Sequence, residues 1–128
     1  MFKTGHDKTR EEILKESAEV LGRAGERLSA ALRELERIEK LIEGKMESLK
    51  GLSEGTVNGR GVQDMKRPAR LQHAITGEIN REIRRYNRAR EHAKLRYYYL
   101  IVTREAVGFR RHKTVEEHYS LPPKKNYL

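Results

Sequence analysis

Every seventh residue from position 14 to position 49 is a large aliphatic, and this repeat constrains the fold more than any other feature. The residues are Leu14, Leu21, Leu28, Leu35, Ile42 and Leu49. A side chain returns to the same side of an α-helix every two turns, so the repeat draws one apolar seam along a long helix. A seam of this kind predicts that a second helix lies along it.

The composition favours a thin helical bundle over a thick globular core. Ala, Glu, Lys, Leu and Arg supply 67 of the 128 residues, which is typical of coiled coils and long helices. Leu, Ile, Val and Phe supply only 28, so order depends on concentrating them in stripes. The length predicts a single helical domain over residues 1–128, and the absence of cysteine excludes disulfides.

Signals for helix ends predict two long helices joined by a loop. A capping box at Thr9 and Glu12 predicts a first helix over about 10–50, with Gly51 as its stop. Residues 51–67 contain four glycines without periodicity and predict a loop. Pro68 suits the first turn of a second helix over about 68–107, capped by Gly108. The apolar stripe of that helix is Ile75, Ile79, Ile83, Tyr86, Ala93, Tyr97, Leu100 and Ile101.

The predicted fold is therefore all-α: a long antiparallel, coiled-coil-like helical hairpin with a short C-terminal element over 109–128. In that element, Thr114 and Glu117 form a second capping box, which predicts one helical turn through Tyr119. Pro122 and Pro123 end the turn and begin an extended tail.

A stripe of small residues runs beside the leucine seam. Ala18, Gly22, Gly25 and Ser29 lie within about 60° of one another at 100° per residue. Glycine inside a helix costs roughly 1 kcal/mol relative to alanine, so the stripe predicts close packing of another helix or an aromatic ring. Tolerated surface glycines are the alternative.

The second helix becomes apolar nearly all round toward its C-terminal end. The residues are Leu95, Tyr97, Tyr98, Tyr99, Leu100, Ile101 and Val102. One partner helix cannot cover side chains that point in all directions, so the C-terminal tail or another subunit must cover the rest. The simplest closure is a homodimer in which two hairpins form a four-helix bundle.

Positive charge is concentrated in the second half of the chain. The net charge is +9, but residues 1–59 carry 11 basic and 12 acidic side chains, whereas residues 60–113 carry 15 and 5. One face of the second helix holds a basic ridge consisting of Arg81, Arg84, Arg85, Arg88 and His92. An acidic protein, a nucleic-acid backbone or anionic lipid could bind such a ridge. Alternatively, its arginines pair with the acidic residues of the first helix.

The sequence contains little that indicates catalysis. The spacings of phosphate loops, dinucleotide sites, zinc proteases and calcium loops are absent, and no histidine follows a glutamate at the spacing used by di-iron bundles. Arg85–His92 and Arg67–His73 match the Arg–His spacing of HEPN-type ribonucleases, although 17 arginines make chance matches easy. No catalytic residue, metal or cofactor is predicted.

The sequence favours a non-enzymatic helical interaction or scaffold protein whose basic surface meets an acidic partner. Sequence-independent binding of RNA or DNA through the basic ridge is the second reading, and an HEPN-like ribonuclease is the third. The longest uncharged stretch in the helical region, Tyr97 to Thr103, is far shorter than the roughly 20 residues needed to span a bilayer. The expectation is a soluble, cytoplasmic protein without a membrane span.

Overall fold

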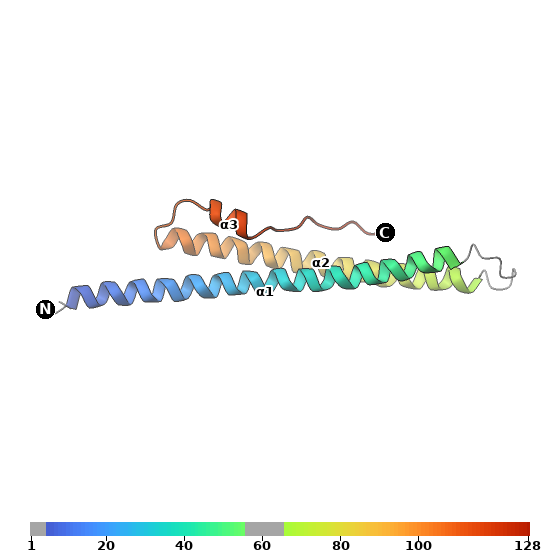
Figure 1. The fold of residues 1–128 in the computed structure, drawn as a ribbon, viewed down its shortest axis with the longest axis horizontal. Helices are drawn as coiled ribbons and strands as arrows, with labels where there is room; N and C mark the ends of the chain where they lie inside the picture. Colours follow the sequence, from blue (N-terminus) through green and yellow to red (C-terminus); the bar gives the residue numbers. More distant parts are fainter. Residues whose placement is uncertain (1–4, 56–65) are drawn as a thin grey trace. The chain divides into compact units, whose positions relative to one another are not determined.

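The computed structural model describes residues 5–55 and 66–128, which form three helices and no strand (Figure 1). The two long helices are α1 (Gly5–Gly55) and α2 (Lys66–Ala106), and the short one is α3 (Lys113–His118). The all-α class and the packing of two long helices against each other are confirmed. The predicted loop falls mostly on residues 56–65, outside the described ranges.

Both long helices run through two compact units. Unit 1 consists of Met1–Leu32 and His92–Pro122, and unit 2 of Arg33–Glu91 and Pro123–Leu128. Each unit therefore has its own stretch of α1 packed against its own stretch of α2. Each can be understood from its own core and its own polar contacts.

The core of unit 2 is the predicted pairing of the leucine seam with the isoleucine stripe. Its buried residues are Leu35, Ile38, Ile42, Ile79, Ile83 and Tyr86. Cross-helix contacts at Glu34–Arg85, Lys45–Glu78 and Ser53–Gln72 run in opposite directions along the two helices, which makes the pair antiparallel. The stripes predicted from periodicity are buried here because each faces the other helix.

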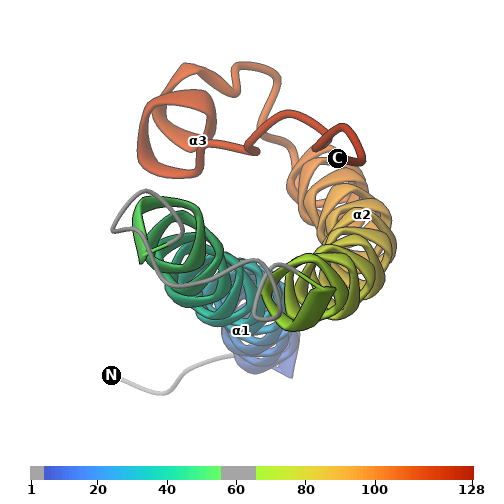
Figure 2. The ribbon, with the colours of Figure 1, turned by 90° about the vertical axis from the view of Figure 1, so that its right-hand side faces the viewer.

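The core of unit 1 is smaller and involves all three helices. Leu28 of α1, Leu100 of α2 and Val115 of α3 are buried together. Around them pack the half-buried Leu21, Ala24, Leu32, Tyr97, Ile101 and Tyr119. Figure 2, which views the helices end-on, shows α3 as a separate short helix and not as an extension of α2. The C-terminal element is thus a structural part of unit 1.

The limits of α1 differ from the prediction at both ends. The helix begins at Gly5, so Thr9 lies inside it and the predicted capping box does not start it. A capping box marks a place where a helix can begin, and no residue between 5 and 9 prevents the helix from starting earlier. At the other end α1 continues through Gly51 to Gly55. There Leu52 is half-buried and Ser53 accepts a hydrogen bond from Gln72, so packing on α2 outweighs the low helix propensity of glycine.

The helix α2 begins two residues before the predicted start at 68 and ends one residue before the predicted end at 107. Pro68 lies in its first turn. At the other end Gly108 has a φ of 102°, in the left-handed region that favours glycine. The amide of Gly108 donates to the Glu105 carbonyl, and the amide of Phe109 donates to the Arg104 carbonyl. These two bonds define a Schellman cap, in which Gly108 satisfies carbonyls that the helix end leaves free.

The short helix α3 is confirmed, but its predicted cap is wrong. The N-cap residue is His112, without a side-chain capping bond, and Thr114 lies inside the helix. His112 is held by other contacts: Arg104 Nε donates to its Nδ1 at 3.3 Å, and its Nε2 lies 3.1 Å from a Glu105 oxygen. Side chains at the end of α2 therefore fix the entry to α3, and these contacts cannot be read from a local motif.

None of the helices in the described ranges has an apolar stretch long enough to cross a bilayer. Within the same ranges, no cluster of three or more acidic or histidine side chains could hold a metal ion.

Candidate functional site: basic surfaces of the two units

The ridge arginines of α2 lie on the surface of unit 2. Arg81, Arg84, Arg85 and Arg88 are all exposed, while Ile83 and Tyr86 between them are buried in the core. The same periodicity that buries the isoleucine stripe turns the arginines outward. His92, the fifth predicted member, is exposed on the part of α2 that belongs to unit 1.

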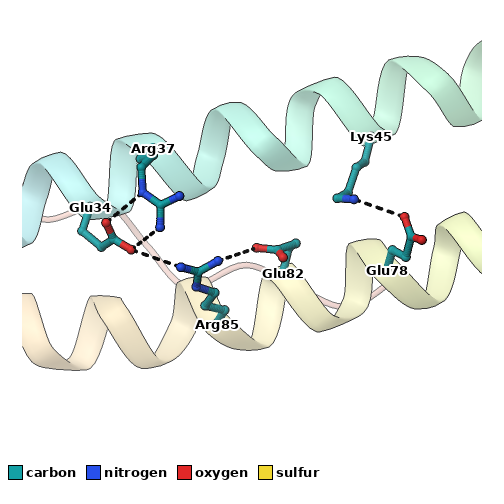
Figure 3. Close-up of polar contacts among 6 residues, drawn as sticks. All are labelled: Glu34, Arg37, Lys45, Glu78, Glu82 and Arg85. Carbon is teal, nitrogen blue, oxygen red and sulfur yellow. Dashed lines mark hydrogen bonds and ion pairs between the residues drawn. The ribbon is translucent and has the colours of Figure 1, made fainter.

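Arg85 differs from the rest of the ridge because it is ion-paired. Its guanidinium lies 3.6 Å from Glu34 of α1 and 3.7 Å from Glu82 of its own helix (Figure 3). This Glu82 oxygen is buried and has no hydrogen-bond partner among the described residues, so the charge of Arg85 compensates it in part. Within the described residues, Arg81, Arg84 and Arg88 form no ion pair.

Glu34 is shared between two arginines. Arg37, one turn along α1, donates two hydrogen bonds to it at 2.6 and 2.9 Å, and Arg85 approaches from α2 (Figure 3). The hydrogen bonds from Arg37, together with the positive charge of both arginines, lower the pKa of the Glu34 carboxyl group. On this flank of unit 2 the two helices therefore carry complementary charges, and Lys45–Glu78 at 3.1 Å continues the pattern.

Unit 1 has a groove between α1 and α2 where the two helices carry like charges instead. Arg23 and Arg27 of α1 and Arg96 of α2 line a groove of about 540 Å³ between the helices. The remaining lining residues are Val20, Ala24, Tyr99 and Thr103. None of the three arginines forms an ion pair with any residue that the structure describes. The groove thus presents three uncompensated guanidinium groups beside apolar and aromatic surface. We call it the arginine groove.

A second, mostly apolar groove adjoins the arginine groove and shares Val20 and Thr103 with it. Its other lining residues are Ile13, Glu16, Ser17, Val102, Ala106 and Val107. Ile13, Val20 and Val102 are exposed large aliphatic side chains. Together the two grooves make one continuous surface of unit 1 that is basic at one end and apolar at the other.

The predicted small stripe lies on the opposite flank of α1. Relative to Leu28, Gly25 lies about 60° to one side and Arg27 about 100° to the other. A Cβ atom on Gly25 would lie 3.3 Å from the Tyr119 hydroxyl, whereas one on Gly22 would meet nothing within 4 Å. Ala18 is exposed and Ser29 half-buried. Of the two glycines in the stripe, only Gly25 is closely approached by another side chain. That side chain is Tyr119, which follows α3, so the close packing does not come from α2.

The residues of the tyrosine-rich end are placed in different surroundings. Leu100 is buried, and Tyr97 and Ile101 pack on the unit 1 core. Burial and the nearby Glu116 carboxylate raise the pKa of Tyr97. Leu95, Tyr98, Tyr99 and Val102 remain exposed. The C-terminal element therefore covers part of this segment, as the sequence allowed, and leaves the remainder open.

Sequence reasoning missed the arginine groove. The available signal was the antiparallel register, which brings residues 20–27 of α1 beside 96–103 of α2.

Searches of family models, curated proteins and solved structures find no match for this chain.

Proposed function

We propose that this chain is a non-enzymatic helical interaction or scaffold protein whose basic surface binds an acidic partner protein. The observation that carries the proposal is the arginine groove, where both helices contribute like charges to one wall. Arginines that face each other without a carboxylate repel, so they do not serve the helix pair itself. An acidic side chain from a partner would supply the missing charge, and guanidinium groups suit paired hydrogen bonding to carboxylates.

The lining beside the arginines favours a protein partner over a bare phosphate backbone. Val20, Ala24 and Tyr99 give the groove apolar surface, and the adjoining apolar groove extends it. An amphipathic helix with acidic residues at one end could place its carboxylates against the arginines and its apolar side chains along Ile13 and Val102. Helix-in-groove binding commonly uses such spaced apolar anchors.

The second candidate is sequence-independent binding of RNA or DNA through the ridge. Three exposed arginines, Arg81, Arg84 and Arg88, support it, because they form no ion pair within the part of the chain that the structure describes. Such ridges bind phosphates by charge and counterion release. The third candidate, an HEPN-like ribonuclease, has less support. Its Arg85 is already paired with Glu34 and Glu82, and His92 is exposed.

The first two candidates can be separated with labelled probes. Fluorescence anisotropy would compare an acidic amphipathic peptide with single-stranded RNA and duplex DNA, using wild type and an Arg81→Glu/Arg84→Glu/Arg88→Glu variant. We expect the peptide to bind more tightly than either nucleic acid and to retain most of its affinity in the variant. Tight nucleic-acid binding that the variant abolishes, with log affinity falling by about 0.7–0.9 per log unit of salt per phosphate contact, would establish the second candidate instead.

We further propose that unit 1 self-associates, giving the dimeric four-helix bundle expected from the sequence. The exposed large apolar side chains of unit 1 that line neither groove support it: Leu14, Leu95 and Tyr98. Clusters of this kind usually mark an interaction surface. Light scattering should give the mass of two chains, and replacing Leu95 and Tyr98 with Glu should reduce it to one. A strict monomer at micromolar concentration would exclude the bundle.

A further inference from the structure

The last residues of the chain are held to unit 2 by two asparagines of α2. Asn87 accepts a hydrogen bond from the Lys125 amide at 2.9 Å and donates one to the Lys125 carbonyl at 3.0 Å. Asn80 accepts one from the Leu128 amide at 2.8 Å and donates one to the Leu128 carbonyl at 3.4 Å. Each side-chain amide thus pairs with both backbone groups of one tail residue.

The spacing of the asparagines matches an extended chain. Seven residues of α-helix separate Asn80 from Asn87, a rise of about 10.5 Å at 1.5 Å per residue. Three residues separate Lys125 from Leu128, and an extended chain covers about 10 Å in three steps. The two lengths agree, so Asn80 and Asn87 together can bind the backbone of a short extended segment, whatever side chains it carries at the two positions. We call these two asparagines the clamp.

The Lys125 side chain supplies the selectivity that the backbone contacts lack. Its ammonium group lies 3.1 Å from a Glu39 carboxylate oxygen and 4.9 Å from the centre of the Tyr86 ring. Tyr86 is buried in the core, so its ring is a fixed platform, and burial raises the pKa of its hydroxyl. A carboxylate together with an aromatic face recognises a cation through charge and the ring quadrupole.

Residues 123–128, the tail, contact unit 2 as a bound peptide does and not as a segment of the core does. Tyr127 and Leu128, its large apolar residues, remain more than half exposed, at 55% and 53%. A segment recruited to stabilise the fold would bury such side chains, since burial is the main source of stability. Here the attachment uses backbone hydrogen bonds and the ion pairs of two lysines, Lys125 with Glu39 and Lys124 with Glu91 at 3.5 Å. Backbone hydrogen bonds with selective side-chain contacts are the combination by which extended peptides are commonly bound.

We propose that Glu39, Asn80, Tyr86 and Asn87 form a binding site for extended, lysine-bearing peptide segments of a partner protein, and that residues 123–128 are its exchangeable resident occupant. The bound segment places lysine at the Asn87 position and extends three residues further to Asn80. This site lies in unit 2 and is independent of the arginine groove, so either can be correct without the other.

Occupancy by the tethered tail predicts a distinctive competition. A tethered segment acts at an effective concentration in the millimolar range, so it lowers the apparent affinity for a peptide added in solution. The reduction equals the fraction of molecules whose site is free. Weakening the tail should therefore strengthen binding of the free peptide, whereas weakening the clamp should abolish it. A tail with only a structural role would produce neither effect.

The test uses the full chain and a fluorescein-labelled peptide with the sequence of residues 121–128, followed by anisotropy. We expect Lys125→Ala in the chain to tighten peptide binding by about tenfold, corresponding to loss of roughly 1.4 kcal/mol of tail docking. Adding Asn80→Ala and Asn87→Ala to that chain should weaken binding at least about tenfold. A peptide with its second lysine replaced by alanine should also bind weakly.

Asn126→Ala provides a matched control, because Asn126 is exposed and its side chain forms no hydrogen bond or ion pair with the described residues. It should leave peptide binding at the wild-type level. Circular dichroism would verify that helix content is equal in all variants. Absence of saturable binding to the Lys125→Ala chain, or binding that survives loss of both asparagines, would overturn the proposal.

Discussion

The two units differ in the charges that α1 and α2 bring to their contact. In unit 2, Glu34 and Lys45 of α1 meet Arg85 and Glu78 of α2, so each charge has a counter-charge. In unit 1, arginines of α1 meet an arginine of α2 beside exposed apolar side chains. A contact that serves only folding has no reason to place like charges together. This difference in charge pairing is the reason for the proposal that the arginine groove of unit 1 receives a partner.

The cores differ in the same sense. Unit 2 buries a continuous row of large side chains between two helices, including Ile38, Ile79 and Tyr86. Unit 1 has a small cluster centred on Leu28, Leu100 and Val115 and needs α3 to complete it. Hydrophobic stabilisation grows with the apolar area buried, so unit 2 should supply most of the stability of the chain.

The largest expected effect on stability comes from a substitution in the buried core of unit 2, which tests that inference. Ile79 is fully buried, and Ile79→Ala should lower the free energy of unfolding by about 2–5 kcal/mol through lost burial and the resulting cavity. Leu71→Ala on the same helix is the control, since Leu71 is 51% exposed. Urea denaturation should show a much smaller change for the control. Equal losses for the two variants would contradict the burial pattern.

A pair of glycine substitutions tests the flank of unit 1 that α3 covers. Gly25→Leu should destabilise the chain by about 1–3 kcal/mol, because the new side chain must displace the Tyr119 hydroxyl group. Gly22→Leu enters open space and should instead stabilise α1 by up to about 1 kcal/mol through better helix propensity. Thermal denaturation should therefore shift in opposite directions. Shifts of the same sign would show that Tyr119 does not pack on Gly25.

The smallest expected effect concerns the charge pairs of unit 2. Arg37, by its hydrogen bonds and charge, and Arg85, by its charge, lower the pKa of Glu34 in the folded chain. The ionised Glu34 carboxylate therefore contributes stability at pH values above its unfolded pKa, near 4.5, and this stability is lost as the pH falls through the folded pKa. Glu34→Gln should therefore lower the melting temperature slightly at pH 7 and leave it unchanged at low pH. Both residues of the Glu34–Arg85 pair are partly exposed, so the difference should be small and reduced by salt. A difference that persists at low pH would point to another cause.

Periodicity is the part of this structure that the sequence predicts well. The seam residues Leu28, Leu35 and Ile42 are buried because a repeat of seven keeps them on one face of α1. Leu14 belongs to the same repeat but is 64% exposed. Ile13 lines a groove with Val107, the residue that follows the last residue of α2, so the helix that would cover Leu14 stops there. A repeat predicts a face, whereas burial depends on where the partner helix ends.

Contacts between distant segments could not be predicted from local patterns. The attachment of Tyr119 beside Gly25 joins positions 94 residues apart in the chain, and the clamp joins α2 to the tail. Asn80 and Asn87 carry no local signal, because asparagine inside a helix is ordinarily a solvated residue. The arginine groove also depends on register between two helices, although the excess of positive charge predicted that some basic surface would stay unpaired.

The central claim is that the arginine groove serves a partner and not the fold. The most direct test measures the affinity of an acidic amphipathic peptide for wild type and for an Arg23→Gln/Arg27→Gln/Arg96→Gln variant. Removing three uncompensated charges should leave the melting temperature unchanged or raise it, since no ion pair of the described structure is lost. The account predicts at least about a hundredfold loss of peptide affinity, roughly 1 kcal/mol for each charge-assisted contact. Unchanged affinity, or loss of affinity only together with unfolding, would contradict it.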